Sequence, residues 1–308
     1  MTRVSYQGTH GAFSHQACQK YFNEKETHFR GCQTFNDVLD LVKSGDCDYA
    51  VIPVDNSSAG RIAEVYNILP YSDLFIVGEC FLPIHFCLLM PTKAVRGKPD
   101  ENLSKEELME WKNREPNEAE VTDAINRITD IYTHHQGVIL CEKFMKKTLH
   151  KVRIHETWDT AGAARDLAID FDTHSASLAP KTAVRYDMTV LLDKVEDDKN
   201  STSRFLILAS KPLKAQDVTE NPVTSLMFQT KNEAGALFAA LEVFKRHNIN
   251  ITKLETYMIG ANHSSPHFYV DLEINQEDEA GKKALSELVN VTLNVKVLGT
   301  YSRAKGLA

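Results

Sequence analysis

A hydroxyl and a guanidinium stand where a polar loop meets an apolar strand. Residues 195–208 read Val-Glu-Asp-Asp-Lys-Asn-Ser-Thr-Ser-Arg-Phe-Leu-Ile-Leu, so Ser203 and Arg204 lie at the mouth of a β-rich run. α/β proteins commonly keep their ligands at such strand ends. The position suits a catalytic hydroxyl, while the segment alone is equally typical of a turn followed by a core strand.

Two other strand-to-helix corners offer polar groups to a ligand. Residues 3–8 predict a strand that ends at Gly8, and the helix that follows should take Ser14 as its N-cap, with free N–H groups that can receive an anion. A second predicted strand, 49–54, runs into a polar loop containing Asn56 and Ser57. This loop lacks the GxSxG spacing of a nucleophile elbow, which disfavours a serine hydrolase.

Further polar residues follow later strands. Thr133 and the paired His134 and His135 end a predicted strand near 128–132, and Thr160 stands at the start of an Ala-rich helix. Paired histidines suggest a metal site, but adjacent residues point apart and no third ligand is near in the sequence. We therefore expect no metal site at these histidines.

The composition excludes several classes of protein. The chain has 308 residues and a formal net charge of −7, with no basic tract to contact a run of phosphates, so we expect no nucleic-acid partner. No apolar run approaches the ~20 residues that span a bilayer, and the first residues resemble a strand more than a signal peptide. The six cysteines show no metal or CxxC spacing and should be reduced. We expect a cytoplasmic protein without a membrane partner.

The order of the predicted elements indicates three units. Strands and helices alternate up to about residue 210, which is typical of doubly wound, mostly parallel sheets with ligands at the strand ends. Residues 96–127 are rich in charge and read as a solvated insertion. Residues 211–222 read as a linker, and beyond it the order βαββαβ predicts a ferredoxin-like domain over 223–302.

Taken together, these corners resemble the prephenate dehydratase family over nearly the whole chain. The matching segments are Gly11-Ala12-Phe13-Ser14 for the family's glycine turn before Phe-Ser, Ile52-Pro53-Val54-Asp55-Asn56-Ser57 for Pro-x-Glu-Asn-Ser/Thr, Thr133-His134-His135-Gln136 for Ser-His-Pro-Gln, Asp159-Thr160-Ala161-Gly162-Ala163-Ala164 for Ser-Thr-Ala-x-Ala-Ala, and Ser203-Arg204-Phe205 for Thr-Arg-Phe. The C-terminal unit resembles an ACT domain.

The resemblance implies a fold and an assembly. We expect two α/β lobes like those of type 2 periplasmic binding proteins, with the active site between them. The first lobe would span about 1–80 and 189–210 and the second about 81–188, followed by the linker and the ACT domain. The resemblance also implies homodimers or homotetramers built partly through the ACT domains.

The resemblance implies a substrate and residue roles as well. Prephenate would lose carbon dioxide and water to give phenylpyruvate in phenylalanine biosynthesis, without a cofactor. Ser203 would take the role of the family's Thr, and Asn56, Ser57, Thr133 and Thr160 would complete the catalytic set. A further set would bind substrate: Phe13, Ser14, Arg204 and Phe205.

A phenylalanine effector site is implied in the ACT domain. Its predicted residues are Asn232, Gly235, Ala236, Leu237 and Glu255. The family's Arg and Pro are replaced there by Tyr257 and Met258, and Leu140 replaces a polar amide after the histidine motif. Two alternatives therefore stay open: a prephenate decarboxylase that keeps the ring hydroxyl, and a non-catalytic phenylalanine-binding sensor.

Overall fold

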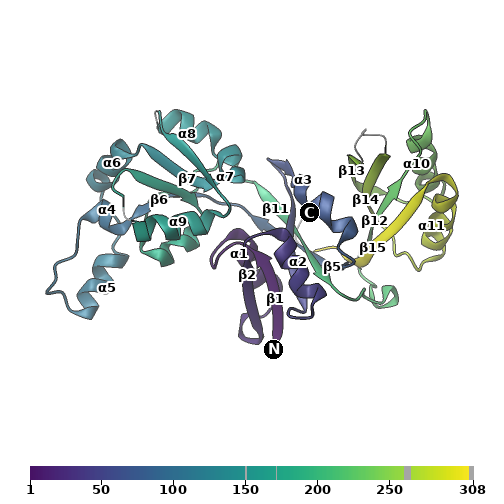
Figure 1. Ribbon diagram of the computed structural model, residues 1–308, viewed down its shortest axis with the longest axis horizontal. Helices are drawn as coiled ribbons and strands as arrows, with labels where there is room; N and C mark the ends of the chain where they lie inside the picture. The colour runs from purple at the N-terminus through teal and green to yellow at the C-terminus, as the bar shows by residue number, and fades with distance from the viewer. Residues whose placement is uncertain (150, 171, 260–264, 305–308) are drawn as a thin grey trace.

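Three β-sheets organise the described part of the chain. The computed structural model describes residues 1–149, 151–170, 172–259 and 265–304. In Figure 1 the second lobe lies at the left, the first lobe in the middle and the C-terminal domain at the right. None of the described helices is long and apolar enough to cross a membrane.

The first lobe is built on a sheet in the order β2-β1-β3-β11-β5, with β4 paired to β3. Its α2 helix begins with a capping box of Thr34 and Asp37, and buries Val38, Leu39 and Val42. The elements of this lobe are β1 (Thr2–Gln7), α1 (Phe13–Tyr21), β2 (Thr27–Cys32), α2 (Phe35–Lys43), β3 (Tyr49–Asn56), β4 (Gly60–Arg61), α3 (Ala63–Ile68), β5 (Phe75–Pro83) and β11 (Thr202–Ala209).

The second lobe has a sheet in the order β10-β6-β9-β7-β8. Because β10 pairs with β6, the chain returns to the first lobe through 193–201, later than the boundary expected at 189. The elements of this lobe are β6 (Cys87–Pro91), α4 (Thr92–Arg96), α5 (Lys105–Asn113), α6 (Glu118–Arg127), β7 (Asp130–His134), α7 (His135–Leu140), α8 (Glu142–Thr148), β8 (Arg153–Thr157), α9 (Thr160–Asp170), β9 (Ser175–Ala179) and β10 (Met188–Leu192).

The two sheets are mixed, so the expectation of mostly parallel sheets was wrong. In the first lobe β1 runs parallel to β2 and β3, but β11 runs antiparallel to both of its neighbours, β3 and β5. In the second lobe β7 is parallel to β8 and β9, whereas β6 is antiparallel to β9 and β10.

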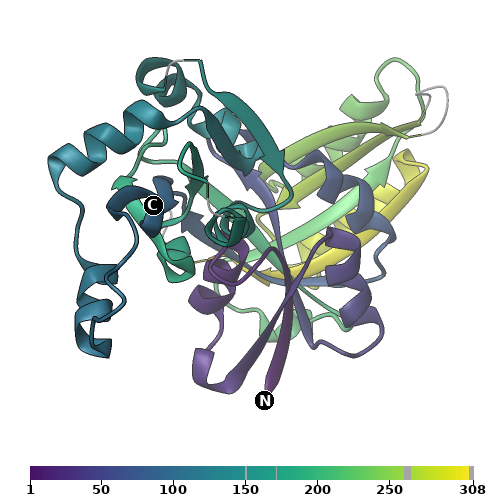
Figure 2. The same ribbon diagram turned by 60° about the vertical axis from the view of Figure 1, so that its left-hand side comes forward.

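The charged insertion forms an arm on the second lobe. Both α5 and α6 begin with capping boxes, at Ser104 and Asn117, and α5 buries none of its residues. Figures 1 and 2 both show α5 reaching away from the sheet. The expectation of a solvated insertion is therefore confirmed for α5 only. Helix α6 buries Ala124 and packs Val121 and Ile125 against the core of the second lobe.

The C-terminal domain has the predicted βαββαβ order. Its antiparallel sheet runs β13-β14-β12-β15, and α10 and α11 pack on one face around Phe228, Phe244 and Val270. The elements are β12 (Pro222–Gln229), α10 (Ala236–Arg246), β13 (Ile251–Ile259), β14 (Ser265–Leu272), α11 (Glu279–Val291) and β15 (Asn294–Ser302).

The other face of this sheet docks on the first lobe. Met227, Tyr269 and Leu298 share one core cluster with Ile76 and Leu206 of the first lobe. The two backbones approach so closely that a Cβ at Gly299 of β15 would lie 2.1 Å from the carbonyl oxygen of Ile76 in β5. Glycine at 299 therefore permits this contact, and the domain is packed tightly against the sheet of the first lobe.

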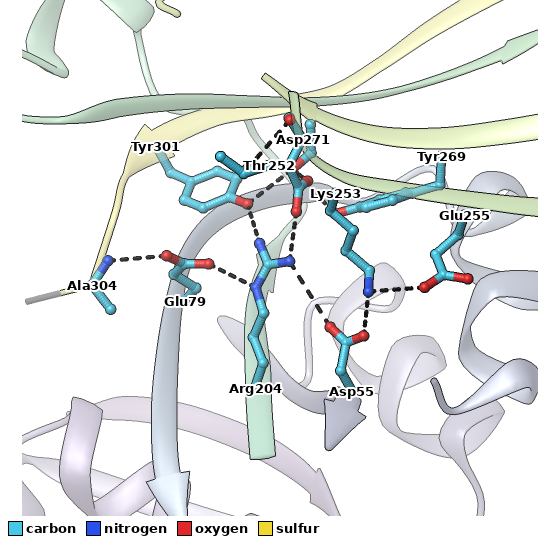
Figure 3. Close-up of polar contacts among 11 residues, drawn as sticks. Asp55, Glu79, Arg204, Thr252, Lys253, Glu255, Tyr269, Asp271, Tyr301 and Ala304 are labelled. Carbon is cyan, nitrogen blue, oxygen red and sulfur yellow. Dashed lines mark hydrogen bonds and ion pairs between the residues drawn. The ribbon is translucent and has the colours of Figure 1, made fainter. Parts of the chain in front are cut away.

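Arg204 lies in this interface, which corrects its predicted role in binding substrate. Figure 3 shows its guanidinium among acidic side chains from both units. It donates to Glu79 Oε2 at 2.7 Å, to Asp271 Oδ2 at 2.5 Å and to the Tyr301 hydroxyl at 2.9 Å. Side chains alternate along a strand, so Arg204 points away from the face that carries Ser203.

The network around Arg204 is buried on both sides. Glu79 and Asp271 are 4% and 2% exposed, and Asp271 also accepts from Ser225 at 2.5 Å. Burial disfavours a charged guanidinium, but Tyr301 and Asp271 outweigh that effect and raise the pKa of Arg204. The guanidinium therefore forms buried ion pairs that join the sheet of the first lobe to the C-terminal domain.

Replacing Arg204 should weaken the whole chain. Arg204→Leu leaves Glu79 and Asp271 buried without their cation, so we expect the free energy of unfolding to fall by about 3–5 kcal/mol. The matched control is Arg303→Leu, which breaks only the half-exposed pair with Glu273 and should cost less than about 1 kcal/mol. Urea unfolding followed by circular dichroism measures both. Equal losses of unfolding free energy in the two variants would contradict the role of Arg204 as the buried partner of Glu79 and Asp271.

Candidate active site

A cleft between the two lobes collects most of the predicted site residues. It encloses about 790 Å³, open solvent included, and residues of both lobes line it. Among the predicted residues, the lining includes Phe13, Ser14, Asn56, Thr160, Ser203 and Phe205.

Ser203 is held by Asn56 across paired strands. The two residues face each other in the β11–β3 register, and Asn56 Nδ2 donates to Ser203 Oγ at 3.1 Å and to Ser201 Oγ at 3.0 Å. The Asn56 carbonyl oxygen accepts from Ser58 N and Ala59 N, which fixes the amide. The Ser203 proton is donated to none of the described residues, so it is available to a ligand.

Two helix N-termini contribute to the cleft, one from each lobe. Helix α1 starts at Phe13 with Ala12 at its N-cap and no side-chain cap, so the prediction that Ser14 caps it was wrong. Ser14 and Thr160, at the starts of α1 and α9, are 6% exposed, and neither hydroxyl has a hydrogen bond to the described residues. The free N–H groups at the start of α1 and the two hydroxyls suit a carboxylate, whereas Gly162 N at the start of α9 already donates to Asp159 at 2.8 Å.

Aromatic side chains form the apolar wall of the cleft. Phe13 packs edge-on against Phe86 with ring centroids 5.0 Å apart, and these two come from different lobes. Phe205 is buried on the same face of β11 as Ser203. With Ile84 and Leu140, they make a surface suited to an unsaturated carbon ring.

The loop after β1 ties the lobes together beside the cleft. Thr9 donates its backbone N–H and its hydroxyl to Asp159 Oδ2 at 2.9 and 2.5 Å. Gln7 Nε2 donates to the Trp158 carbonyl at 2.9 Å, and Thr182 donates to the Gly11 carbonyl at 2.5 Å. The glycine turn predicted to receive an anion is therefore also the contact between lobes.

Two predicted catalytic residues lie outside the cleft lining. Thr133 is fully buried in the second sheet, where its hydroxyl donates to the Leu178 carbonyl at 2.7 Å. A Cβ at Gly137 would meet that hydroxyl at 2.2 Å, so α7 sits directly over it. Ser57 turns to the outer side of β11 and accepts from Thr202 N at 3.0 Å. Both hydroxyls are engaged in structure, which corrects the expectation that they hold substrate.

The predicted effector residues fall in separate places within one chain. Gly235, at φ +84°, precedes Ala236 and Leu237 at the start of α10, on the helical layer of the C-terminal domain. Asn232 lies exposed in the preceding loop. Glu255 is on the opposite face, paired with Lys253 at 3.1 Å and with Arg61 of the first lobe at 3.5 Å. A single chain does not assemble them into one site.

Other cleft residues were missed from sequence. Gln136 has a buried Oε1 without a partner among the described residues, and Asp159 is 5% exposed. His134 also lines the cleft, and burial lowers its pKa. All three residues lie within the matched family motifs. They were not chosen because residue 159 is a serine in the family, and because the paired histidines were considered only as metal ligands.

The histidines do not form a metal site. His134 Nδ1 accepts from Gln136 N, whereas His135 faces Glu156, so the two rings point apart as predicted. Within the described ranges, no group of three His, Cys, Asp or Glu side chains could hold a metal ion. All six cysteines are free, as expected.

A buried histidine behind the glycine turn should make stability depend on pH. His15 is 2% exposed, and burial, followed by nearby His10 and Arg185, lowers its pKa to about 4. An unfolded histidine has a pKa near 6.5, so the unfolded state binds the extra proton first and stability falls as pH drops from about 6.5 to 4.

His15→Gln should reduce the difference between the free energies of unfolding at pH 7 and pH 4.5 by on the order of 2–3 kcal/mol. Urea unfolding at pH 7 and pH 4.5 measures the difference for the wild type and the variant. His28→Gln, on the exposed side of β2, is the matched control. An unchanged difference in His15→Gln would show that other groups cause the pH dependence.

Comparisons with known proteins agree with this geometry. The family model described as prephenate dehydratase matches residues 4–213. A bifunctional chorismate mutase/prephenate dehydratase of Aquifex aeolicus is 31% identical over 302 residues, which cover 98% of this chain and 74% of that protein. Arogenate dehydratase 2 of Petunia hybrida is 32% identical over 322 residues, covering 99% of this chain and 73% of that protein.

Solved structures share the fold across the whole chain. A prephenate dehydratase from Arthrobacter aurescens in complex with L-Phe has a TM-score of 0.80 at 21% identity and covers 100% of this chain and 92% of its own. GqqA, described as a novel type of quorum quenching acylase, has a TM-score of 0.77 at 26% identity and covers 98% of each chain. The family predicted from the motifs is confirmed: the chain belongs to the prephenate dehydratase family, whose members are carbon–oxygen lyases.

Proposed function

We propose that the interlobe cleft converts prephenate to phenylpyruvate, with Ser203 as the group that protonates the departing hydroxide. One observation carries this proposal. Asn56 donates into the Ser203 oxygen at 3.1 Å and thereby directs the serine proton toward the cleft. The hydroxyl is a donor to the ligand, the role that a leaving hydroxide needs.

The reaction needs little beyond positioning and this proton. The bond between the ring and its carboxylate breaks, carbon dioxide leaves, and the electron pair moves into the ring as the opposite carbon–oxygen bond breaks. The departing hydroxide takes a proton and leaves as water, and the ring becomes aromatic. Aromatisation supplies the driving force, so the aromatic wall of Phe13 and Phe86 has mainly to hold the ring flat.

The carboxylates would be held by neutral groups. The proposed contacts are the open N-terminus of α1, the free hydroxyls of Ser14 and Thr160, and Asn56. Gln136 joins this set because a buried amide oxygen without a partner has a cost that a ligand can relieve. The Gln136 side-chain amide can present either its oxygen or, after rotation by 180°, its N–H₂ group to the ligand.

The surroundings of Ser203 do not suit a nucleophilic serine. A nucleophilic serine requires a group that removes its proton, but its partner here is an amide N–H donor. This argues against an acylase reaction through Ser203. The retained hydroxyl likewise disfavours a decarboxylase that keeps the ring hydroxyl, and the assembled cleft disfavours a sensor without activity.

The C-terminal domain is proposed to be an ACT regulatory domain. Its βαββαβ order supports residues 223–302 as that domain after a linker at 211–222, with the catalytic lobes before it. The related structure solved with L-Phe supports phenylalanine as effector. Exposed Phe238 and Leu254 support a homo-oligomer, in which a second copy would unite the separated effector residues. A likeness to periplasmic binding proteins and a cytoplasmic location stay predictions.

A second candidate substrate is arogenate, the amino-acid counterpart of prephenate. One relative is named for it. The observation that favours it here is the charge of the cleft, in which the described lining residues include carboxylates and neither lysine nor arginine.

The serine hydroxyl can be tested directly. Ser203→Ala should lower kcat for phenylpyruvate formation by roughly 10²–10⁴-fold, because the proton donor is lost. Ser203→Thr should retain activity, and Ser210→Ala, an exposed residue just after β11, is the matched control. A discontinuous assay that separates phenylpyruvate from non-aromatic keto acids is the measurement. Full activity in Ser203→Ala would refute the assignment, and a non-aromatic product of the wild type would indicate a decarboxylase.

A further inference from the structure

The interlobe cleft has no lysine or arginine among its described lining residues with which to hold an acidic substrate. The lining includes the carboxylates of Glu64 and Asp159, and its other polar side chains are hydroxyls, amides, an indole and one imidazole. An acid bound there has to be held by neutral N–H and O–H groups. The imidazole is that of His134, and its two ring nitrogens have different surroundings.

One ring nitrogen of His134 is bound to the backbone. His134 is the N-cap of α7, and the backbone N–H of Gln136 donates to its Nδ1 at 3.2 Å. A backbone N–H only donates, so Nδ1 accepts and carries no proton. Burial lowers the pKa of His134, so the ring is neutral near pH 7. The single proton of the ring is therefore fixed on Nε2.

The Nε2–H group of His134 is left as a donor to a ligand. Nε2 has no hydrogen bond to the residues that the structure describes, whereas the ring of the adjacent His135 faces Glu156. His134 belongs to the second-lobe part of the cleft lining, as do Gln136 and Thr160. This part of the cleft therefore presents a neutral N–H donor whose direction is set by the cap of α7.

The shape of prephenate directs its acidic end toward the second lobe. The departing hydroxyl and the two acidic substituents stand on opposite carbons of the six-membered ring. With the hydroxyl at Ser203 on β11 of the first lobe, the acidic end points away from β11, toward the wall that carries His134. The ring carboxylate has to lose its charge as carbon dioxide, whereas the keto-acid side chain is unchanged by the reaction. A fixed donor on the side chain binds the substrate without stabilising the carboxylate that must leave.

We propose that His134 binds the keto-acid side chain of prephenate through its Nε2–H group. The proposal rests on the proposed function, because it takes the hydroxyl end of the substrate to lie at Ser203. No proton is transferred in this contact. The hydrogen bond is the same in substrate, transition state and product, so its loss weakens the binding of all three alike. His134 thereby sets which end of the ring meets Ser203.

Two substitutions separate this donor from the capping role of the ring. His134→Asn keeps an acceptor for Gln136 N, because asparagine is a favoured N-cap residue, but it has no donor at the position of Nε2. We expect KM for prephenate to rise by about 10- to 100-fold, with kcat and the urea midpoint of unfolding nearly unchanged. His134→Gln carries an N–H donor about as far out as Nε2 and is a poor cap. It should keep KM close to the wild-type value and lower the midpoint.

Calorimetric binding of phenylpyruvate is the second measurement, because this product keeps the side chain and lacks the ring carboxylate. Its Kd should rise in His134→Asn by a factor similar to that of KM. The matched control is His135→Asn, on the exposed neighbouring histidine, which should leave both values unchanged.

An unchanged KM and Kd in His134→Asn, equal losses in His134→Asn and His134→Gln, or a fall in kcat instead of a rise in KM would overturn the proposal while the proposed function stands. A wild type that forms no phenylpyruvate from prephenate would refute the proposed function instead. The Kd values for phenylpyruvate would then still decide whether His134 holds the side chain.

Discussion

The alternation of side chains along β11 sets the arrangement of the whole molecule. Ser203 and Phe205 point into the interlobe cleft, and Arg204 between them points to the C-terminal domain. Because β11 is flanked by β3 and β5, neither face can be shifted without breaking the pairing on both edges. One strand therefore positions the proposed proton donor and anchors the domain behind it.

The cleft binds through fixed dipoles rather than mobile cations. Besides Glu64, Asp159 and His134, its polar groups are hydroxyls, amides and helix N–H groups. Such groups are preorganised and change little during reaction, which suits a substrate that becomes aromatic once it is held in place. The contact of Thr9 with Asp159 joins the two lobes beside the cleft.

The sequence predicted those features that depend on local spacing. The βαββαβ order and most strand positions need only neighbouring residues, and the structure confirms them. The motifs also brought Asn56 and Ser203 to one cleft.

The incorrect predictions concern residues whose roles depend on how distant parts of the chain pack together. Because side chains alternate along β11, Arg204 and Ser203 point to opposite faces of the sheet. Which of these faces lines the cleft depends on how the two lobes are placed. Thr133 looked like a ligand-binding hydroxyl because the packing of Gly137 over it is not visible in the chain. Asp159 and Gln136 escaped notice because their roles follow from burial in a cleft shared by both lobes.

A crystal structure of the Ser203→Ala variant with bound substrate tests the central claim most directly. The account predicts the ring against Phe13 and Phe86 in the interlobe cleft, with its hydroxyl facing residue 203. A ligand bound instead behind β11, in the charged cavity of about 870 Å³ lined by Arg204, Lys253 and Asp271, would contradict it.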